Sequence, residues 1–339
     1  MKVLFIVNPK SGFSGFRKQV GQAIAHLAEF GYLIKRVETS GPGDATKLAQ
    51  QAIEEEYDIT VAVGGDGTIN EVVNGLAGSN TALAVLPAGT ANVYAADVGI
   101  PIGSLINPDA IKKAVEVLAT GQRRRIDLGR LTLADGTSRY FLMWSGVGLD
   151  AAISEAKKSN IRSSRSLGYM AWFMATMMLL FEFRGNPATL EMDNETIQER
   201  LIVAVASNGQ LYGRVWRFAP EAKLDDGLLD VGVMVGHRWW QILKHGISLT
   251  LRRHIQDTNF HLHRTKSLTI RTKYPMPVHV DGETIGNTPI TVEVVPAALD
   301  VIVPDNVPGR LFKDGNPYED QTKKRGLKWP SLPLKRKRD

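Results

Sequence analysis

The sequence contains no cysteine, and its longest uncharged apolar stretch is short. Without cysteine the chain forms no disulfides, holds no thiolate-bound metal and has no cysteine nucleophile, which fits a reducing compartment. The uncharged stretch, residues 166–181, is shorter than the roughly 20 residues that a transmembrane helix needs. Met1 to Val7 carries a single lysine and runs directly into a strand pattern, so we expect no signal peptide and a cytoplasmic protein.

A net positive charge is also missing from most of the chain, although the total net charge is +6. Residues 323–339 hold eight basic residues and one acid, a net charge of +7, so the remainder of the chain carries −1. A near-neutral body does not predict a nucleic-acid partner. The basic tail has two interpretations: a solvated charge run, or a peripheral contact with the anionic inner membrane face. Such a contact gains about 1 kcal/mol per basic residue near the lipid surface.

The most informative stretch covers residues 59–76 and combines a strand, a glycine-rich turn and a helix start. Residues 59–63 are a continuous apolar run, which is typical of a buried parallel strand. After Thr68, apolar residues recur at helical spacing. Between the two patterns, three glycines at positions 64, 65 and 67 surround Asp66.

This arrangement predicts a site for nucleotide phosphates. A glycine backbone can approach a phosphate closely, and the first free N–H groups of a helix attract it. The spacing matches neither the dinucleotide fingerprint nor a Walker A loop. The alternative is an ordinary strand-to-helix corner. Because like charges repel, we expect Asp66 to act through a bound cation or on a hydroxyl rather than on the phosphate.

Two other predicted strands end in loops of small polar residues. Apolar residues 3–7 lead into Asn8–Gly12, and apolar residues 81–86 lead into Pro87–Asn92. In an open parallel sheet, loops at the carboxyl ends of the strands lie on one edge, where ligands bind. Strand and helix patterns alternate until a helix over residues 108–120, so we expect a doubly wound α/β domain.

The pattern becomes all-β after residue 123, with short strand-like segments separated by turns such as Asp135-Gly136 and Asp281-Gly282. We therefore expect domains over residues 1–121 and 122–305, followed by a flexible basic tail over 306–339. The apolar stretch 166–181 interrupts the β segments. It is either a helix buried in protein or a helix that lines an acyl-chain pocket or dips into a membrane.

The motifs Asn8–Gly12, Gly64–Glu71 and Pro87–Asn92 resemble those of the bacterial diacylglycerol kinase-type lipid kinases. Sphingosine and ceramide kinases share that catalytic domain, and NAD kinases are distant relatives of it. Further motifs of the family follow in order, at residues 127–129, 145–150, 223–228 and 280–283. The resemblance covers about residues 2–303. It implies that the second domain is a β-sandwich and that ATP binds in the cleft between the two domains.

The resemblance also implies which residues line ATP. Phosphoryl transfer needs positioned phosphates, neutralised negative charge and an aimed hydroxyl, and charged, hydroxyl and bare-backbone residues can meet these needs. The implied residues follow predicted strands: they are Asn8, Pro9, Lys10, Ser11, Gly12, Thr39, Gly64, Gly65, Asp66, Gly67, Thr68, Ile69, Asn70, Glu71, Gly89, Thr90 and Asn92.

The implied catalytic set is Glu283, Asp281 and Asp66. Glu283 would be the general base, since a carboxylate within hydrogen-bond reach can take the hydroxyl proton as the oxygen attacks. Asp66 would hold a magnesium network or orient the hydroxyl. From the residues alone, Asp281-Gly282 also fits a plain type I′ hairpin turn, because Asp-Gly is the commonest signal for one.

Residues 223–228 resemble the family's magnesium site, built from the Asp226 carboxylate and the backbone carbonyls of Lys223 and Leu228. Oxygen-only ligands suit Mg²⁺, and the alternative is another Asp-Gly turn. One position departs from the family pattern. Where many bacterial members have Asn-Asp, this chain has Asn92-Val93, so a carboxylate expected beside the nucleotide magnesium is missing.

The leading hypothesis is an ATP- and Mg²⁺-dependent lipid kinase that converts diacylglycerol to phosphatidic acid. A sphingoid base, ceramide or phosphatidylglycerol is an alternative acceptor. A soluble-substrate kinase of the NAD kinase type is a second hypothesis, against which the apolar stretch 166–181 argues. The third is a non-catalytic nucleotide sensor, which would need no base such as Glu283. The sequence leaves open whether the protein forms a homo-oligomer.

Overall fold

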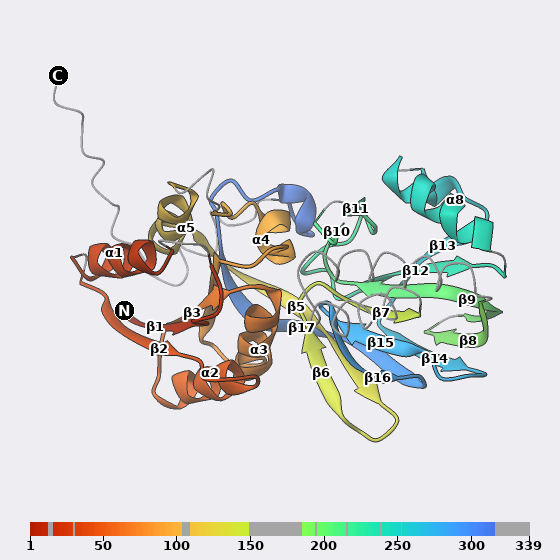
Figure 1. The fold of residues 1–339 in the computed structure, drawn as a ribbon, viewed down its shortest axis with the longest axis horizontal. Coiled ribbons are helices and arrows are strands. Elements are labelled where there is room, and N and C mark those ends of the chain that lie inside the picture. The colour runs from red at the N-terminus through yellow and green to blue at the C-terminus, as the bar shows by residue number, and fades with distance from the viewer. Residues whose placement is uncertain are drawn as a thin grey trace, which may run out of the picture. The chain divides into compact units, whose positions relative to one another are not determined.

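The computed structural model describes residues 1–12, 16–29, 31–103, 109–148, 185–193, 195–214, 216–237, 239–251 and 253–315. The chain folds into two compact units (Figure 1). Unit 1 contains Met1–Ile126 and the segment from Ala297 onward, and unit 2 contains Asp127–Pro296. The predictions for the apolar stretch 166–181 and for the basic tail 323–339 lie outside the described residues.

Unit 1 is an α/β unit around a parallel sheet. Its elements are β1 (Lys2–Val7), α1 (Phe16–Glu29), β2 (Leu33–Glu38), α2 (Asp44–Glu54), β3 (Ile59–Gly64), α3 (Asp66–Leu76), β4 (Ala82–Pro87), α4 (Val93–Val98), α5 (Asp109–Thr120) and η2 (Gly309–Leu311). The strand order is β2-β1-β3-β4, with all pairs parallel. α1 packs against α5 and α2 against α3, and the two pairs cover opposite faces of the sheet (Figure 1). The predicted doubly wound domain is confirmed.

The helix coverage explains the apolar runs in the central strands. Every residue of β3 and β4 is buried, because helices cover both faces of a parallel sheet. α3 buries Ile69, Val72, Val73 and Leu76, the positions predicted from helical spacing. Each such side chain contributes about 1.5–3 kcal/mol on full burial. This packing fixes the glycine-rich turn at the carboxyl end of a central strand.

Unit 2 is built mainly from antiparallel strands. Its elements are β5 (Gln122–Leu133), β6 (Ser138–Phe141), β7 (Trp144–Gly148), β8 (Asn186–Met192), β9 (Thr196–Ser207), β10 (Leu211–Tyr212), β11 (Trp216–Arg217), β12 (Leu229–Val235), α8 (Trp239–Thr250), η1 (His254–Gln256), β13 (Phe260–Thr265), β14 (Ser267–Thr272), β15 (Pro277–Val280), β16 (Glu283–Asn287) and β17 (Ile290–Val303). Inward-facing residues such as Leu190, Val231 and Val278 form one apolar core. The predicted all-β second domain is confirmed.

The boundaries between the two units fall within strands, because β5 and β17 each begin in one unit and end in the other. The predicted domain bounds, 1–121 and 122–305, stay a prediction. One detail differs from the sequence analysis: α8 lies in a region where the all-β pattern predicts no helix. Among the described residues, no helix is long and apolar enough to cross a membrane.

Candidate active site

The loops after β3 and β4 contact each other backbone to backbone. A side chain added at Gly89 would place its Cβ 2.5 Å from the Cα of Gly65, and one added at Gly64 would lie 2.6 Å from the Thr68 side chain. These separations are too short for any Cβ, so the two turns require glycine for close approach. The predicted convergence of strand-end loops is therefore present within unit 1.

Asp66 joins these two loops through hydrogen bonds. Its carboxylate accepts the Asn92 N–H at 2.8 Å and the Val93 N–H at 2.7 Å, at the start of α4. Hydrogen bonds to an ionised group are worth about 1.5–3 kcal/mol each. The Asp66 side chain therefore positions the loop 87–92 against the glycine-rich turn. Its predicted action on a magnesium network or a hydroxyl stays a prediction.

Asn92 organises the same loop from within. It is fully buried and has φ 48° and ψ 56°, a left-handed conformation that asparagine tolerates better than most residues. Its side chain accepts the Gly89 N–H at 2.9 Å and donates to the Gly89 carbonyl at 2.7 Å. Val93, where the family pattern has a carboxylate, has a side chain that is only 2% exposed. Position 93 therefore presents a buried isopropyl group in place of a carboxylate.

The loop after β1 is attached to both of these turns. The Asn8 amide donates to the Thr68 hydroxyl at 3.0 Å, and the Gly12 N–H donates to the Ala88 carbonyl at 2.9 Å. Lys10 is exposed at the tip of this loop. Three predicted phosphate-binding loops thus form one hydrogen-bonded group at the carboxyl edge of the sheet. An exposed ammonium beside bare backbone amides is suited to an anionic phosphate.

Other predicted nucleotide residues have different surroundings. The Glu71 carboxylate accepts the backbone N–H groups of Gly43 at 2.9 Å and Ala45 at 3.1 Å, so it caps the start of α2. Ile69 and Asn70 are almost completely buried in α3. Thr39 follows β2 and donates its N–H to the Val7 carbonyl at 3.0 Å, which places it at the sheet edge. Sequence spacing could not separate Glu71 from the phosphate loop, because its partners lie 26 and 28 residues away.

The remaining predicted residues of this loop set lie at the same edge. Gly65 and Gly67 are half-buried, Thr90 is exposed and Thr68 is buried beneath the turn. Pro9 and Ser11 belong to the loop after β1, in which the Ser11 N–H donates to the Asn8 carbonyl at 3.1 Å.

Within unit 2, Asp281 fixes a neighbouring turn. Its carboxylate accepts three consecutive backbone N–H groups, those of Leu142, Met143 and Trp144, at 2.8 to 3.1 Å. Asp281 and Gly282 both have positive φ, 45° and 86°, and they join β15 to β16. The hairpin-turn interpretation is therefore confirmed in the backbone. The Asp281 side chain holds the β6–β7 connection in place.

Replacing Asp281 by alanine is expected to destabilise unit 2, because three backbone donors lose an anionic acceptor. The expected loss in free energy of unfolding is about 2–3 kcal/mol. Urea denaturation followed by tryptophan fluorescence would measure it. Asp135→Ala is the matched control, since Asp135 also begins an Asp-Gly turn and its carboxylate is bonded locally, accepting the Thr137 N–H at 2.8 Å. Equal midpoints for the two variants would contradict this role of Asp281.

Glu283 lies two residues further on, and its carboxylate is accessible. Its Oε2 lies 2.7 Å from the Arg139 guanidinium, and about a third of the side chain (35%) is exposed. Arg139 was not recognised in the sequence, because it lies 144 residues away and belongs to no motif. The ion pair orients the carboxylate while leaving it reachable by a hydroxyl. The role of Glu283 as general base stays a prediction.

The predicted magnesium turn is supported by a second carboxylate. Asp226 accepts the Leu228 N–H at 3.1 Å, and the buried Asp127 accepts the Gly227 N–H at 2.7 Å. Burial raises the pKa of the nearby Asp230 carboxyl, and the negative charge of Asp226 raises this pKa further. The positive charge of Arg264 partly offsets these two effects. The described residues contain no group of three or more His, Cys, Asp or Glu side chains placed to hold a metal. One carboxylate with backbone carbonyls remains a fitting donor set for Mg²⁺, so the site with Lys223 stays a prediction.

The chain is similar to known families and proteins over most of its length. Residues 2–131 match the family described as the diacylglycerol kinase catalytic domain, and residues 145–303 match the YegS C-terminal NAD kinase β-sandwich-like domain. A relative named diacylglycerol kinase from Bacillus subtilis (strain 168) is 29% identical over 286 residues, covering 84% of this chain and 90% of that protein. One of that name from Staphylococcus aureus (strain MRSA252) is 28% identical over 306 residues, with coverages of 89% and 92%.

Solved structures agree with this similarity. The structure of a diacylglycerol kinase from Bacillus anthracis str. Sterne has a TM-score of 0.66 at 22% identity, covering 90% of this chain and 98% of that one. A second structure from the same strain has a TM-score of 0.71 at 25% identity with the same coverages. These matches and relatives together show an enzyme of the lipid kinase class. Residues 2–131 belong to the diacylglycerol kinase catalytic domain family and residues 145–303 to the YegS C-terminal domain family.

Proposed function

We propose that this protein transfers the γ-phosphoryl group of ATP to a lipid hydroxyl, with diacylglycerol as the preferred acceptor and phosphatidic acid as the product. The observation that carries the proposal is the group of three glycine-containing loops that Asp66 and Asn8 hold together at one sheet edge. The relatives named diacylglycerol kinase, which this chain matches almost end to end, support the choice of acceptor.

Unit 1 would bind the nucleotide. Its backbone amides and the Lys10 ammonium would hold the phosphates, because phosphoryl transfer depends chiefly on positioning and on stabilisation of negative charge. Mg²⁺ would be held by Asp226 with the carbonyls of Lys223 and Leu228, and when bound it supplies positive charge to the phosphate oxygens. Glu283 would accept the proton of the attacking hydroxyl, with Arg139 keeping its carboxylate in place.

The direct test is transfer of labelled phosphate from ATP, with Mg²⁺ present, into a total lipid extract resolved by chromatography. Label that comigrates with phosphatidic acid, and that increases when diacylglycerol is added, would support the proposal. A labelled spot of different mobility would identify another lipid acceptor. A blank plate from protein that binds ATP would overturn the proposal.

NAD is the second acceptor to test. The specific reason is that residues 145–303 match a domain described as NAD kinase β-sandwich-like. The same labelled ATP, offered with NAD in place of lipid, would give labelled NADP if the protein were a soluble-substrate kinase. We expect no such product, because the acceptors named by the relatives are lipids.

The basic tail supplies a separate prediction about location. Deleting residues 323–339 removes a net charge of +7 and is expected to lower affinity for anionic vesicles by at least about tenfold at low salt. The difference should shrink as salt rises, because screening shortens the reach of the charges from about 10 Å at 0.1 M to about 3 Å at 1 M. Vesicle sedimentation of both proteins across a salt series would measure it, and equal binding throughout would reject a membrane role for the tail.

A further inference from the structure

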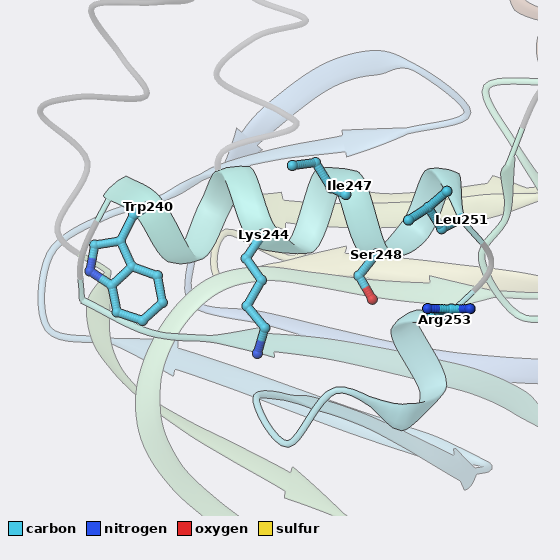
Figure 2. A pocket seen from close by; sticks show the side chains of 6 residues that line it. All are labelled: Trp240, Lys244, Ile247, Ser248, Leu251 and Arg253. Carbon is cyan, nitrogen blue, oxygen red and sulfur yellow. The ribbon is translucent and has the colours of Figure 1, made fainter.

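One side of α8 presents apolar side chains to solvent. Trp240, Ile247 and Leu251 are 45%, 53% and 60% exposed, and Lys244 lies among them at helical spacing. Figure 2 shows these side chains along the helix, around a hollow of about 370 Å³ that Ser248 and Arg253 complete. We name this set of six residues the α8 face.

The helix is already attached to unit 2 by its other side. The buried His245 ring contacts the Val235 carbonyl at 3.3 Å, and the Gln241 side chain accepts the His237 N–H at 2.9 Å. The Trp216 indole N–H donates to the Thr250 hydroxyl at 3.3 Å. α8 therefore has a packed side and a solvent side, and the α8 face is held in a fixed orientation.

Exposed apolar residues concentrate around this helix. Among the described residues, nine large hydrophobic side chains are exposed, and five of them lie between residues 216 and 255. The additional two are Trp216 on β11 and Ile255 on η1, and both elements contact α8. Scattered exposed side chains are normal on a protein surface, whereas a local group of this kind marks an interaction surface.

The charge around the α8 face identifies the partner. The described basic residues of residues 239–254 and 209–219 are Lys244, Arg253, Arg214 and Arg217, and these two segments contain no acid. Lys244 pairs at 3.0 Å with Asp257, whose side chain is buried, so the net positive charge comes from the arginines. A symmetric contact with a second copy would bring these cations together. An anionic lipid surface instead matches both the cations and the apolar side chains, and tryptophan is a favoured residue at that interface.

We propose that the α8 face docks this protein on an anionic bilayer, with Trp240, Ile247 and Leu251 entering the interfacial region and the surrounding cations meeting lipid phosphates. The inference rests on the proposed function, since a lipid acceptor is reached at a membrane. This interaction surface contains none of the candidate active-site residues of unit 1 or unit 2.

The test compares vesicle binding by the full-length protein and by the double variant Ile247→Ser/Leu251→Ser. Leu33→Ser is the matched control, because Leu33 is 70% exposed on β2 in unit 1. Vesicles contain phosphatidylglycerol with phosphatidylcholine, or phosphatidylcholine alone. At high salt, where the tail is screened, the double variant is expected to bind the anionic vesicles roughly tenfold or more weakly than the wild type. The control is expected to bind like the wild type.

Two further measurements separate this proposal from others. The phosphorylation rate on detergent-dispersed diacylglycerol is expected to be equal in the double variant and the wild type. If neither protein forms any lipid product, the proposed function is rejected. The vesicle-binding result then decides separately whether the α8 face docks on a bilayer. Equal vesicle binding by wild type and double variant would overturn the α8 proposal. Sedimentation analysis that showed a wild-type dimer and a monomeric double variant would also overturn it, in favour of a second copy.

Discussion

Replacing Glu283 by glutamine is expected to abolish phosphoryl transfer while ATP binding persists. Glutamine keeps the size of the side chain and removes its ability to take a proton, and general base catalysis contributes about 10²–10⁴-fold to a rate. The loss should appear in kcat, because the proton moves only as the hydroxyl attacks. Steady-state rates with diacylglycerol, together with ATP binding measured by calorimetry, would separate the two steps.

Glu293→Gln is the matched control for this experiment. Glu293 also belongs to unit 2 and pairs with an arginine, Arg130, at 3.0 Å, yet it carries no predicted role in the reaction. Its replacement should leave the rate within about twofold, because exposed ion pairs contribute little to stability. Undiminished turnover by the Glu283 variant would exclude that residue as the base, and equal losses in both variants would indicate a general effect of removing an arginine partner.

Asp66→Asn is expected to impair use of ATP. Asparagine keeps one side-chain oxygen and turns an NH₂ group toward one of the two backbone donors, Asn92 N–H or Val93 N–H. The loss of one hydrogen bond to a charged group amounts to about 1.5–3 kcal/mol. If this hydrogen-bond energy holds the two loops in the arrangement that binds ATP, kcat/KM for ATP should fall about 10- to 100-fold. Kinetics at varied ATP and saturating lipid would measure the change.

Asp58→Asn provides the comparison for Asp66. Asp58 also belongs to unit 1, and its carboxylate accepts the Lys2 N–H at 2.7 Å. It precedes β3 and lies at the amino ends of the strands, whereas the phosphate loops lie at the carboxyl ends. We expect a modest loss of stability and unchanged ATP kinetics. An Asp66 variant with wild-type kcat/KM would show that the hydrogen bonds to α4 do not control nucleotide use.

The sequence was sufficient to predict the sheet edge at which the phosphate loops meet. Residues 59–63 are apolar on both faces, which happens when helices cover a parallel sheet on both sides, and this pattern is local in the chain. The glycines at positions 64 and 65 follow at once. Because strand-end loops of a parallel sheet share an edge, three such local patterns were enough to place Asn8, Asp66 and Asn92 near one another.

Partners of individual side chains could not be predicted in this way. Glu71 continues a motif in sequence, yet its carboxylate binds α2, and Asp281 binds amides 137 to 139 residues away. Periodicity describes which face of an element is buried and contains no information about such distant backbone donors. α8 was missed because strand-like segments precede and follow it and the all-β pattern was extended across it, although Trp240, Ile247 and Leu251, the residue after the helix, are apolar at helical spacing.

The hydrogen bond between Asp66 and the main chain of Val93 limits which residues position 93 tolerates. Because the contact is made to a backbone N–H, it forms with any residue other than proline at position 93. The valine side chain therefore leaves the connection between the two loops intact. Val93→Asp would place a second carboxylate at a position that is only 2% exposed and next to Asp66, where an unpaired charge is very unfavourable. An acidic side chain could thus be introduced at position 93 only together with changes in neighbouring residues.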